Sequence, residues 1–461
     1  MKKTIRSDIE RVRDFYKSGK TRSIDFRIAQ LRSLYNTLDK YESEIYDALL
    51  KDLNKSPQES FITELAIVKS EIKYMISKTK KLTRPKRVLP SIGQLPGSLK
   101  IVKEPYGSVL IISTWNYPIQ LALLPLVGAI AAGNTVVLKP SEYSPETASL
   151  LKVICDEAFD SGLVSVILGG RSENEELLAS QFDYIFFTGS TNMGKVVMKA
   201  AAENLTPLTL ELGGKSPCIV DKNVNIKETA KRILFGKLIN AGQTCIAPDY
   251  VYVHYDIKQE LISELLDGIK AAIPSEEYFE KSFGKIVNNK HFNRLVSLLK
   301  NQNSITALDQ KLYDSDTQMM RPVIIDEPSL DSDVMMEEIF GPILPIITWS
   351  SEDELINVIN NKPKPLSMYI FSNDNQFIDS IIQRVDSGGV CINDTLLHIS
   401  SNRSPFGGTG PSGMGAYHGK WSIDTFSRER TVLRKSWHFD VPFRHHPYSE
   451  KAFDFLRRLL G

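Results

Sequence analysis

The feature that most constrains the fold is a repeated alternation of short apolar runs and helical runs between residues 108 and 202. Ser108–Ser113 and Tyr184–Phe187 have the length of strands and are almost continuously apolar, and helical runs such as Ile119–Ala132 and Pro145–Phe159 lie between them. Strands that are apolar on both faces are typical of parallel sheets covered by helices on both sides. The sequence therefore predicts an α/β fold with a Rossmann-like domain.

The regions on either side of this alternation differ in character. Residues 1 to about 80 carry apolar side chains at helical spacing, which predicts helices that pack on a larger body. A second stretch, from about 211 to 404, again mixes apolar strands with amphipathic helices. A chain of 461 residues is too long for one small core, so we expect two or three domains.

The composition excludes several classes of protein. A formal charge of +1 provides no global attraction to nucleic acid or to an anionic membrane. The four cysteines form no CxxC pairs and the seven histidines show no ligand spacing, so we expect neither a disulfide scaffold nor a metal site. The N-terminus has no apolar signal segment, and Ile119–Ala132 is shorter than the ~20 residues that cross a bilayer. These features indicate a cytoplasmic protein without a transmembrane segment.

Two glycine-rich segments are candidates for binding phosphate. Gly408–Gly413 has the spacing of a dinucleotide fingerprint, but no strand precedes it and Pro411 lacks a backbone N–H. Phe187–Gly194 is the better candidate because it joins a strand to a helix, where Gly189 permits a tight turn and Ser190 can cap the helix. A plain capped turn between strand and helix remains the alternative.

The polar turn Gly242–Cys245 follows a helical run and presents one thiol. A free cysteine is most often a small buried hydrophobic residue, and only its surroundings make it reactive. We interpret Cys245 as a nucleophile, and this interpretation depends on finding suitable partners elsewhere in the chain.

Motifs along almost the whole chain supply those partners. They are Trp115–Pro118, Lys139–Glu142, Glu211–Lys215, Gly242–Cys245 and Glu337–Pro342. In their order and approximate spacing the chain resembles the aldehyde dehydrogenase superfamily. The late segment Pro405–Lys420, followed by Thr425–Ser427, resembles the class 3 branch, which acts on fatty and aromatic aldehydes.

The resemblance implies NAD(P)-dependent oxidation of an aldehyde to the carboxylic acid. Cys245 would attack the aldehyde to give a thiohemiacetal, Asn116 would hold the oxyanion, and Glu211 would activate the water that hydrolyses the thioester. Without the resemblance, Asn116 would be interpreted as a turn residue and Glu211 as an ion-paired core residue.

Alternative functions also remain open at this point. They are a cysteine-dependent hydrolase or acyltransferase, a dehydrogenase that acylates coenzyme A, and a binding protein without activity. No feature of the sequence links a histidine to Cys245 as a hydrolase requires. Glu211 favours hydrolysis to the acid over transfer to coenzyme A.

The same resemblance implies where the cofactor and the aldehyde bind. Lys139 and Glu142 would hold the adenosine ribose, which favours NAD, although class 3 enzymes often accept NADP as well. The other predicted cofactor residues are Gly189, Ser190, Gly194, Glu338 and Phe340. The residues predicted to line the aldehyde channel are Trp115, Tyr117 and Phe406.

The resemblance also divides the chain into domains. Residues 1–82 and 103–210 would form the NAD(P)-binding domain, and residues 211–412 the catalytic domain. Residues 83–102 and 423–436 would form a small β arm that pairs with a second copy, giving a homodimer. Residues 437–461 would be a C-terminal tail, whose short amphipathic helix makes peripheral membrane contact possible.

Overall fold

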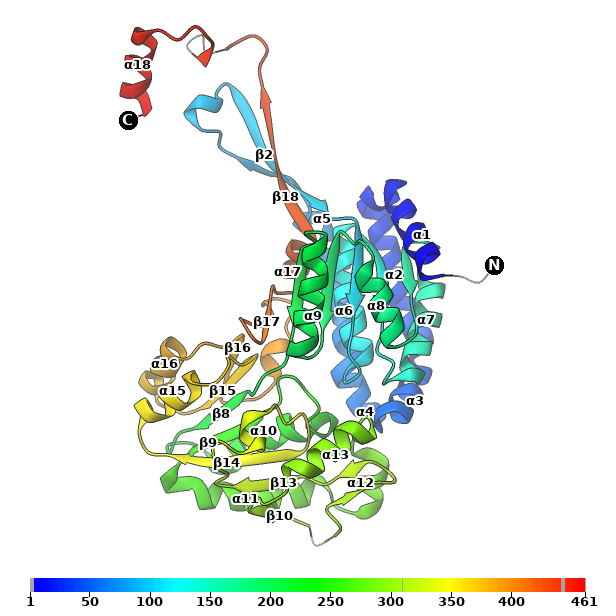
Figure 1. The fold of residues 1–461 in the computed structure, drawn as a ribbon, viewed down its shortest axis with the longest axis vertical. Coiled ribbons are helices and arrows are strands. Elements are labelled where there is room, and N and C mark those ends of the chain that lie inside the picture. The colour runs from blue at the N-terminus through cyan, green and yellow to red at the C-terminus, as the bar shows by residue number, and fades with distance from the viewer. Residues whose placement is uncertain (1–3, 309, 441–443, 461) are drawn as a thin grey trace. The chain divides into compact units, whose positions relative to one another are not determined.

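The computed structural model describes residues 4–308, 310–440 and 444–460. It divides the chain into two compact units, and each is described by itself. The first unit contains residues 1–82 and 105–427, and the second contains residues 83–104 and 428–461 (Figure 1).

The first sheet of the larger unit has six strands, five of them parallel. Its order is β17 (Gly413–Met414), β7 (Leu208–Glu211), β6 (Tyr184–Thr188), β3 (Ser108–Ile112), β4 (Thr135–Lys139) and β5 (Val164–Val166). β17 alone among these runs antiparallel, against β7. The parallel Rossmann-like sheet predicted from the sequence is confirmed.

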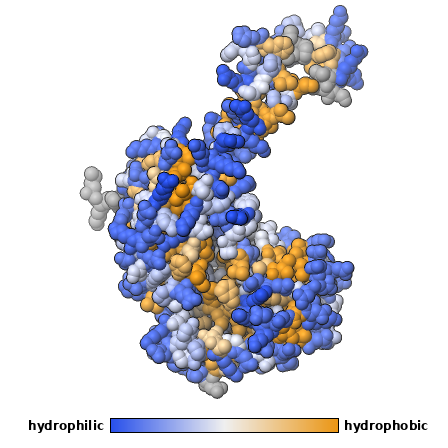
Figure 2. Space-filling model, turned by 180° about the vertical axis from the view of Figure 1, so that it is seen from behind, coloured by the Kyte–Doolittle hydropathy of each residue, from blue (hydrophilic) through white to orange (hydrophobic). Residues whose placement is uncertain are grey.

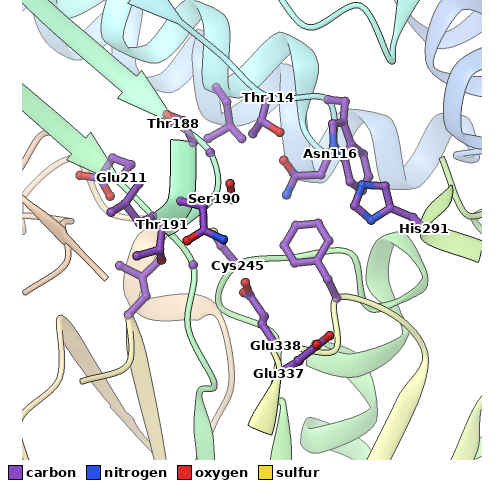
Figure 3. Close-up of a pocket in the computed structure, with 18 of the residues that line it drawn as sticks. Thr114, Asn116, Thr188, Ser190, Thr191, Glu211, Cys245, His291, Glu337 and Glu338 are labelled. Carbon is purple, nitrogen blue, oxygen red and sulfur yellow. The ribbon is translucent and has the colours of Figure 1, made fainter. Parts of the chain in front are cut away.

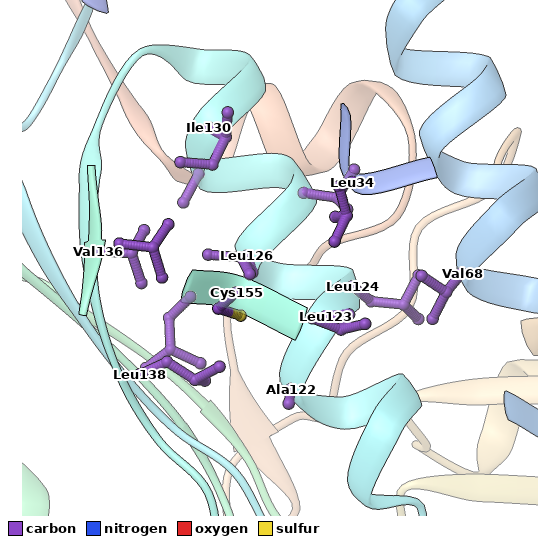
Figure 4. Close-up of a cluster of buried hydrophobic side chains, with 14 of the residues drawn as sticks. Leu34, Val68, Ala122, Leu123, Leu124, Leu126, Ile130, Val136, Leu138 and Cys155 are labelled. Carbon is purple, nitrogen blue, oxygen red and sulfur yellow. The ribbon is translucent and has the colours of Figure 1, made fainter. Parts of the chain in front are cut away.

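Helices cover both faces of this sheet, as strands that are buried on both sides require. One face packs on α2 (Ile24–Lys40), α3 (Glu42–Leu53), α5 (Ala66–Leu82), α6 (Pro118–Ala132) and α7 (Pro145–Ala158). The other face packs on α1 (Ile5–Lys17), α8 (Arg171–Ala179) and α9 (Thr191–Glu203). Every residue of α6 is buried, and Cys155 of α7 lies in the apolar cluster around it (Figure 4). The predicted N-terminal helices are therefore part of the main core.

The second sheet has seven strands, and all neighbours are parallel except β10 and β13. Its order is β10 (Ser304–Thr306), β13 (Val323–Asp326), β14 (Ile343–Trp349), β9 (Tyr250–His254), β8 (Pro217–Val220), β15 (Ser367–Phe371) and β16 (Gly389–Ile392). One core cluster includes residues of α10 (Ile226–Leu238) and α11 (Lys258–Ala272). Another includes residues of α13 (Asn289–Leu298), α15 (Glu352–Asn360) and α16 (Asn375–Arg384).

The remaining elements of this unit are short. They are α4 (Pro57–Ser60), the π-helix η2 (Phe61–Leu65), η4 (Ile239–Gly242), α12 (Glu276–Ser282), β11 (Tyr313–Asp314), β12 (Met319–Met320), α14 (Asp333–Met336), η6 (Leu397–Ile399) and α17 (Lys420–Thr425), with the 3-10 turns η1 (Lys20–Arg22) and η5 (Tyr255–Ile257). Figure 2 shows apolar side chains in patches on one face of an otherwise mostly hydrophilic surface.

Predicted and observed boundaries differ by one or two residues, for identifiable reasons. α9 begins at Thr191, after Ser190, whose hydroxyl caps it by accepting the Met193 N–H. The strand predicted over Ser108–Ser113 ends at Ile112, and the helix predicted over Pro145–Phe159 ends at Ala158, because Phe159 has extended backbone.

The smaller unit contains the strand β1 (Lys86–Val88) and all but one end residue of β2 (Gly97–Pro105) and of β18 (Ser427–Lys435), in that order across one sheet. The turn η3 (Ile92–Gln94) lies between the first two strands, and α18 (Glu450–Leu460) ends the unit. Arg428 and Arg430 of β18 both pair with Glu104 of β2. Among the described residues, no helix is long and apolar enough to cross a membrane.

Candidate active site

The loop that carries Cys245 has an unusual backbone. After α10, the residues Asn240, Ala241 and Gly242 adopt φ values of 50°, 50° and 74°, all in the left-handed region. Two of these residues are not glycine, and such conformations persist only where the surroundings enforce them. Gln243 provides part of that enforcement, because its amide donates to the carbonyls of Asn240 and Lys285 and accepts the Val287 N–H.

Gly242 is needed at its position because a second loop approaches it closely. A Cβ at this residue would lie 2.3 Å from the carbonyl oxygen of Gly341, which belongs to the predicted Glu337–Pro342 motif. Without a side chain the two loops pack backbone to backbone. The nucleophile loop and the Glu338 loop are thus held against each other.

Asn116 lies between the end of β3 and the start of α6 and is almost completely buried. Its side-chain amide donates a hydrogen bond of 3.0 Å to the Gln243 carbonyl, close to Cys245 in the chain. The amide nitrogen carries a second hydrogen, so this bond leaves one donor for a ligand. Figure 3 shows the Asn116 side chain directed into the cavity that Cys245 also lines.

Glu211 is the last residue of β7, and its carboxyl is buried. Neither oxygen has a hydrogen-bond partner among the described residues. Burial raises the pKa of Glu211 well above its usual range. In the view of Figure 3 the carboxyl is turned away from Cys245. An unpaired buried carboxyl is costly for stability, so this residue is better explained by chemistry than by packing.

Burial also raises the pKa of the Cys245 thiol, and the nearby carboxyls of Glu338 and Glu211 raise it further. A thiol in this state is protonated at neutral pH, so its attack on a carbonyl requires a base that accepts the proton. Of the two carboxyls that act on it, Glu211 is the sequence-predicted base.

Two cavities meet at Cys245, which lines both of them. The larger, called the cleft below, has a volume of 660 Å³ and is lined by Asn116, Glu211, Glu338 and the start of α9 (Figure 3). The smaller, called the apolar pocket below, has a volume of 290 Å³. Leu121, Phe406 and Tyr417 also belong to both linings. A molecule in either cavity would therefore lie beside the same cysteine.

The cleft has features that fit a dinucleotide. Gly189, Ser190 and Thr191 place the N-terminus of α9 on its wall, where the first N–H groups of a helix favour an anion. Glu338 is on the opposite loop, and its Oε1 atom is buried without a hydrogen-bond partner among the described residues. An unpartnered buried carboxylate oxygen is suited to accept hydrogen bonds from sugar hydroxyls.

The Glu338 loop is fastened by charged side chains. Arg294 donates to the carbonyls of Glu338 and Ile339, and Asp249 accepts the Ile339 N–H at 2.9 Å. Lys215 pairs with Asp249 and donates to the Glu337 carbonyl. Burial, followed by the negative charge of Asp249, raises the pKa of Glu338 to about 8.

Three of the predicted cofactor residues, Lys139, Glu142 and Gly194, lie outside the lining of the cleft. Lys139 ends β4 and is buried, with its Nζ atom 2.8 Å from the Pro140 carbonyl and 3.9 Å from a Glu142 carboxyl oxygen. Gly194 packs against Leu212, where a Cβ would lie 2.7 Å from a methyl carbon. Gly194 therefore permits close packing of the helix on the sheet.

The apolar pocket contains two of the three predicted channel residues, Tyr117 and Phe406. Trp115 instead lines the cleft, where its ring meets Phe340 edge to face at 5.5 Å between ring centroids. The Tyr117 hydroxyl lies 2.5 Å from that of Thr244, which satisfies both groups. The remaining lining is mostly aliphatic or aromatic and includes Ile62, Ile67, Leu121, Phe235, Ile239, Ile246, Leu396, Leu397 and Ile399.

Sequence reasoning missed several residues of the cleft. His291 lies on its wall with its ring 5.4 Å from that of Trp115, and burial lowers the pKa of His291 to about 4. Thr114 and Arg294 were also missed. His291 lies in a helix far along the chain, and only the tertiary fold brings it to Trp115. Among the described residues, no group of three potential ligands forms a metal site.

Comparison with known proteins places these features in a family context. The profile of the aldehyde dehydrogenase family matches residues 2–432. The chain is 45% identical to 4,4'-diaponeurosporen-aldehyde dehydrogenase of Staphylococcus aureus, with 95% of each chain covered. It is 42% identical to the Rattus norvegicus enzyme named aldehyde dehydrogenase, dimeric NADP-preferring, with 94% of this chain and 95% of that one covered.

The fold is also similar to solved structures. The structure described as the substrate-bound state of Staphylococcus aureus AldH superimposes with a TM-score of 0.95. The two chains are 43% identical, and the match covers 100% of each.

Proposed function

The chain belongs to the aldehyde dehydrogenase family, and on this basis we propose which of its residues carry out the oxidation. The activity is the NAD(P)-dependent conversion of an aldehyde to its carboxylic acid. The observation that carries the proposal is that Cys245 lines both the cleft and the apolar pocket. An aldehyde in the pocket and a nicotinamide in the cleft then lie on either side of one nucleophile.

Cys245 attacks the aldehyde carbon and forms a thiohemiacetal. Glu211 accepts the thiol proton once its carboxyl, turned away from Cys245 in Figure 3, rotates toward the sulfur, and its raised pKa suits it to act as a base near neutral pH. The carbonyl oxygen becomes an oxyanion, and the free hydrogen of the Asn116 amide stabilises it together with the Cys245 backbone N–H. The Asn116 bond to the Gln243 carbonyl keeps the amide oriented before substrate arrives.

Glu338, Phe340 and the α9 N-terminus would hold the cofactor in the cleft, and Lys139 with Glu142 would hold its adenosine ribose. A nicotinamide held there would supply the acceptor for the hydride of the carbon attached to Cys245. The product on the enzyme is a thioester of Cys245. Glu211 releases the thiol proton to solvent and then takes a proton from water, whose oxygen attacks the thioester carbon. The Cys245 thiolate leaves with release of the acid and regains its proton from Glu211.

Glu211 distinguishes this reaction from the two related alternatives. A dehydrogenase that acylates coenzyme A needs no base for water, and here a buried carboxyl without a partner among the described residues lies in the same cleft as the nucleophile. A cysteine hydrolase needs a histidine paired with the thiol, and His291 instead packs on Trp115. A dehydrogenase that hydrolyses its thioester uses this buried carboxyl as a base, whereas packing alone does not explain why the carboxyl is buried.

The apolar pocket supports a hydrophobic aldehyde as substrate. None of its described lining residues is Asp, Glu, Lys or Arg, so nothing there would pair with a charged substituent. Each buried CH₂ group contributes about 0.8 kcal/mol to binding. A series of straight-chain and aromatic aldehydes, assayed with NAD and with NADP by the absorbance of the reduced cofactor, tests this proposal. We expect kcat/KM to rise with chain length, and no signal with any aldehyde would contradict the activity itself.

We also propose a domain division, a homodimer and a cytoplasmic location. Residues 1–82 and 103–210 would bind the cofactor, and residues 211–412 would provide Cys245. The β18 strand lies at the edge of its sheet and exposes Val432 and Leu433, and edge strands readily pair with a second chain. The four free cysteines favour a reducing compartment. Sedimentation of the purified protein measures its oligomeric state, and a monomer at micromolar concentration would contradict the dimer.

A further inference from the structure

A buried ion pair lies in the N-terminal region, outside the site described so far. Lys55 and Glu64 are both 0% exposed, and the Lys55 Nζ atom is 2.7 Å from one Glu64 carboxyl oxygen. The sequence predicts only packing helices in this region, and the family motifs do not include either residue. Burying two charges rarely increases stability relative to apolar residues of the same size, so the pair requires another explanation.

Lys55 contacts the loop that carries the proposed oxyanion residue. Its ammonium donates a hydrogen bond of 2.8 Å to the backbone carbonyl of Asn116 and lies 4.0 Å from the centroid of the Tyr117 ring. The side-chain amide of Asn240, from the nucleophile loop, donates to the same carbonyl at 2.7 Å. Two donors from different segments of the chain therefore fix the Asn116 peptide.

Glu64 contacts the start of the helix that follows this loop. Its second carboxyl oxygen accepts the N–H groups of Ile119 and Gln120, at 2.8 and 3.1 Å, in the first turn of α6. The residue before α6, Tyr117, makes no side-chain capping bond, so a distant carboxylate caps this helix instead. A carboxylate at a helix N-terminus is favoured by the helix dipole. Glu64 itself is in the π-helix η2, a form often found at functional sites.

We propose that Lys55 and Glu64 are positioning residues for the oxidation, acting through Asn116. Together they hold the backbone that follows this residue, from the Asn116 carbonyl to the Gln120 N–H. With the backbone fixed, the Asn116 amide stays oriented toward the oxyanion that forms beside Cys245. This inference rests on the proposed function of Asn116.

Asp52 provides a matched comparison in the same N-terminal region. Its carboxyl is buried and accepts the N–H groups of Glu146 and Thr147, at 3.2 and 2.8 Å, in the first turn of α7. Asp52 thus caps α7 in the way that Glu64 caps α6. Its hydrogen bonds go to α7 and not to the Asn116 loop. A variant of Asp52 therefore shows what the loss of a buried helix cap does to stability when the Asn116 loop is left intact.

A double-mutant cycle tests the proposal. The change Lys55→Met with Glu64→Gln removes both charges but leaves an amide oxygen that accepts the Ile119 and Gln120 N–H groups. We expect kcat to fall about 10- to 100-fold, because small misplacement of a reacting group has effects of that size. The cofactor Kd, measured by fluorescence, should change less than about 2-fold because the pair lies outside the cleft. If the double variant does not fold, Glu64→Gln alone is tested in its place, and we expect a smaller fall in kcat.

The same changes are then made in an Asn116→Ala background. If the pair acts through Asn116, kcat should fall no further there, whereas independent effects would multiply. A repeated 10- to 100-fold loss, or an unchanged kcat in the folded double variant, would overturn the positioning role alone. Wild-type kcat in Asn116→Ala itself would overturn the oxyanion role and, with it, this inference. Asp52→Asn should lower the melting temperature and leave kcat near the wild-type value.

Discussion

The two cavities that meet at Cys245 are lined by different kinds of side chain. The cleft has carboxyls with raised pKa values, and its loops are fastened by Arg294, Lys215 and Asp249. The apolar pocket has no Asp, Glu, Lys or Arg among its described residues, most of which are aliphatic or aromatic. Polar networks fix geometry, whereas apolar contacts select by area and shape. The comparison teaches that changes in the cleft should alter kcat, and changes in the pocket should alter KM.

Removal of the shared sulfur should abolish the function of both cavities. Cys245→Ala should lower kcat by about 10⁴-fold or more, because no other group can form the covalent intermediate. Steady-state production of reduced cofactor measures this loss.

Cys155 provides the control for that variant. It is buried in the α6 cluster, where burial raises its pKa to about 12. Cys155→Ala should cost about 1 kcal/mol of stability and leave kcat unchanged. Substantial activity in Cys245→Ala would show that the two cavities do not share a nucleophile.

A change at Glu211 should slow both halves of the reaction, because the same carboxylate takes the thiol proton and the water proton. Glu211→Gln removes the base for water, and we expect the steady-state kcat to fall about 10²- to 10⁴-fold. Any reduced cofactor formed should appear as a burst of no more than one equivalent, with the acyl group left on Cys245. Mass spectrometry of the quenched enzyme would detect the thioester. Normal acid production by this variant would show that another group activates the water.

A charge placed in the apolar pocket should affect substrate binding alone. Leu397 lines the pocket and is 50% exposed, so Leu397→Glu should be tolerated by the fold. We expect KM for a long aliphatic aldehyde to rise about 10-fold, with little change in kcat or in cofactor Kd. Val153→Glu, at a residue 48% exposed on α7, is the matched control. Equal effects of the two variants would argue against the pocket as the aldehyde site.

The smallest expected effect is a pH dependence of cofactor binding. Glu338 has a pKa of about 8, so the neutral acid predominates below that pH and the carboxylate above it. The carboxylate is the stronger acceptor for ribose hydroxyls, so cofactor affinity should rise about 5-fold as the pH increases through this value. Glu338→Gln should remove the dependence. Fluorescence titrations across the range would contradict this role if wild type and variant gave parallel curves.

The sequence was sufficient to predict the parallel Rossmann-like sheet, because the alternation of apolar strands and helical runs is a local signal. It also predicted residues that the cleft brings together, including Asn116, Glu211 and Cys245. The Lys55–Glu64 pair was not predictable, because helical periodicity does not reveal a charge that is buried by a distant loop. His291 escaped prediction for the same reason, since its contact with Trp115 joins segments far apart in the chain. The position of Trp115 in the cleft also depends on tertiary packing.

The close approach of Gly242 to Gly341 has a practical consequence for protein engineering. Any side chain at residue 242 would bring its Cβ to 2.3 Å from the Gly341 oxygen, so a library that varies this residue would consist almost entirely of inactive clones. The partly exposed mouth of the apolar pocket, at Ile62, Phe235 and Leu397, tolerates diversity without disturbing that junction. Variants intended to accept new aldehydes are therefore best designed at the mouth of the apolar pocket.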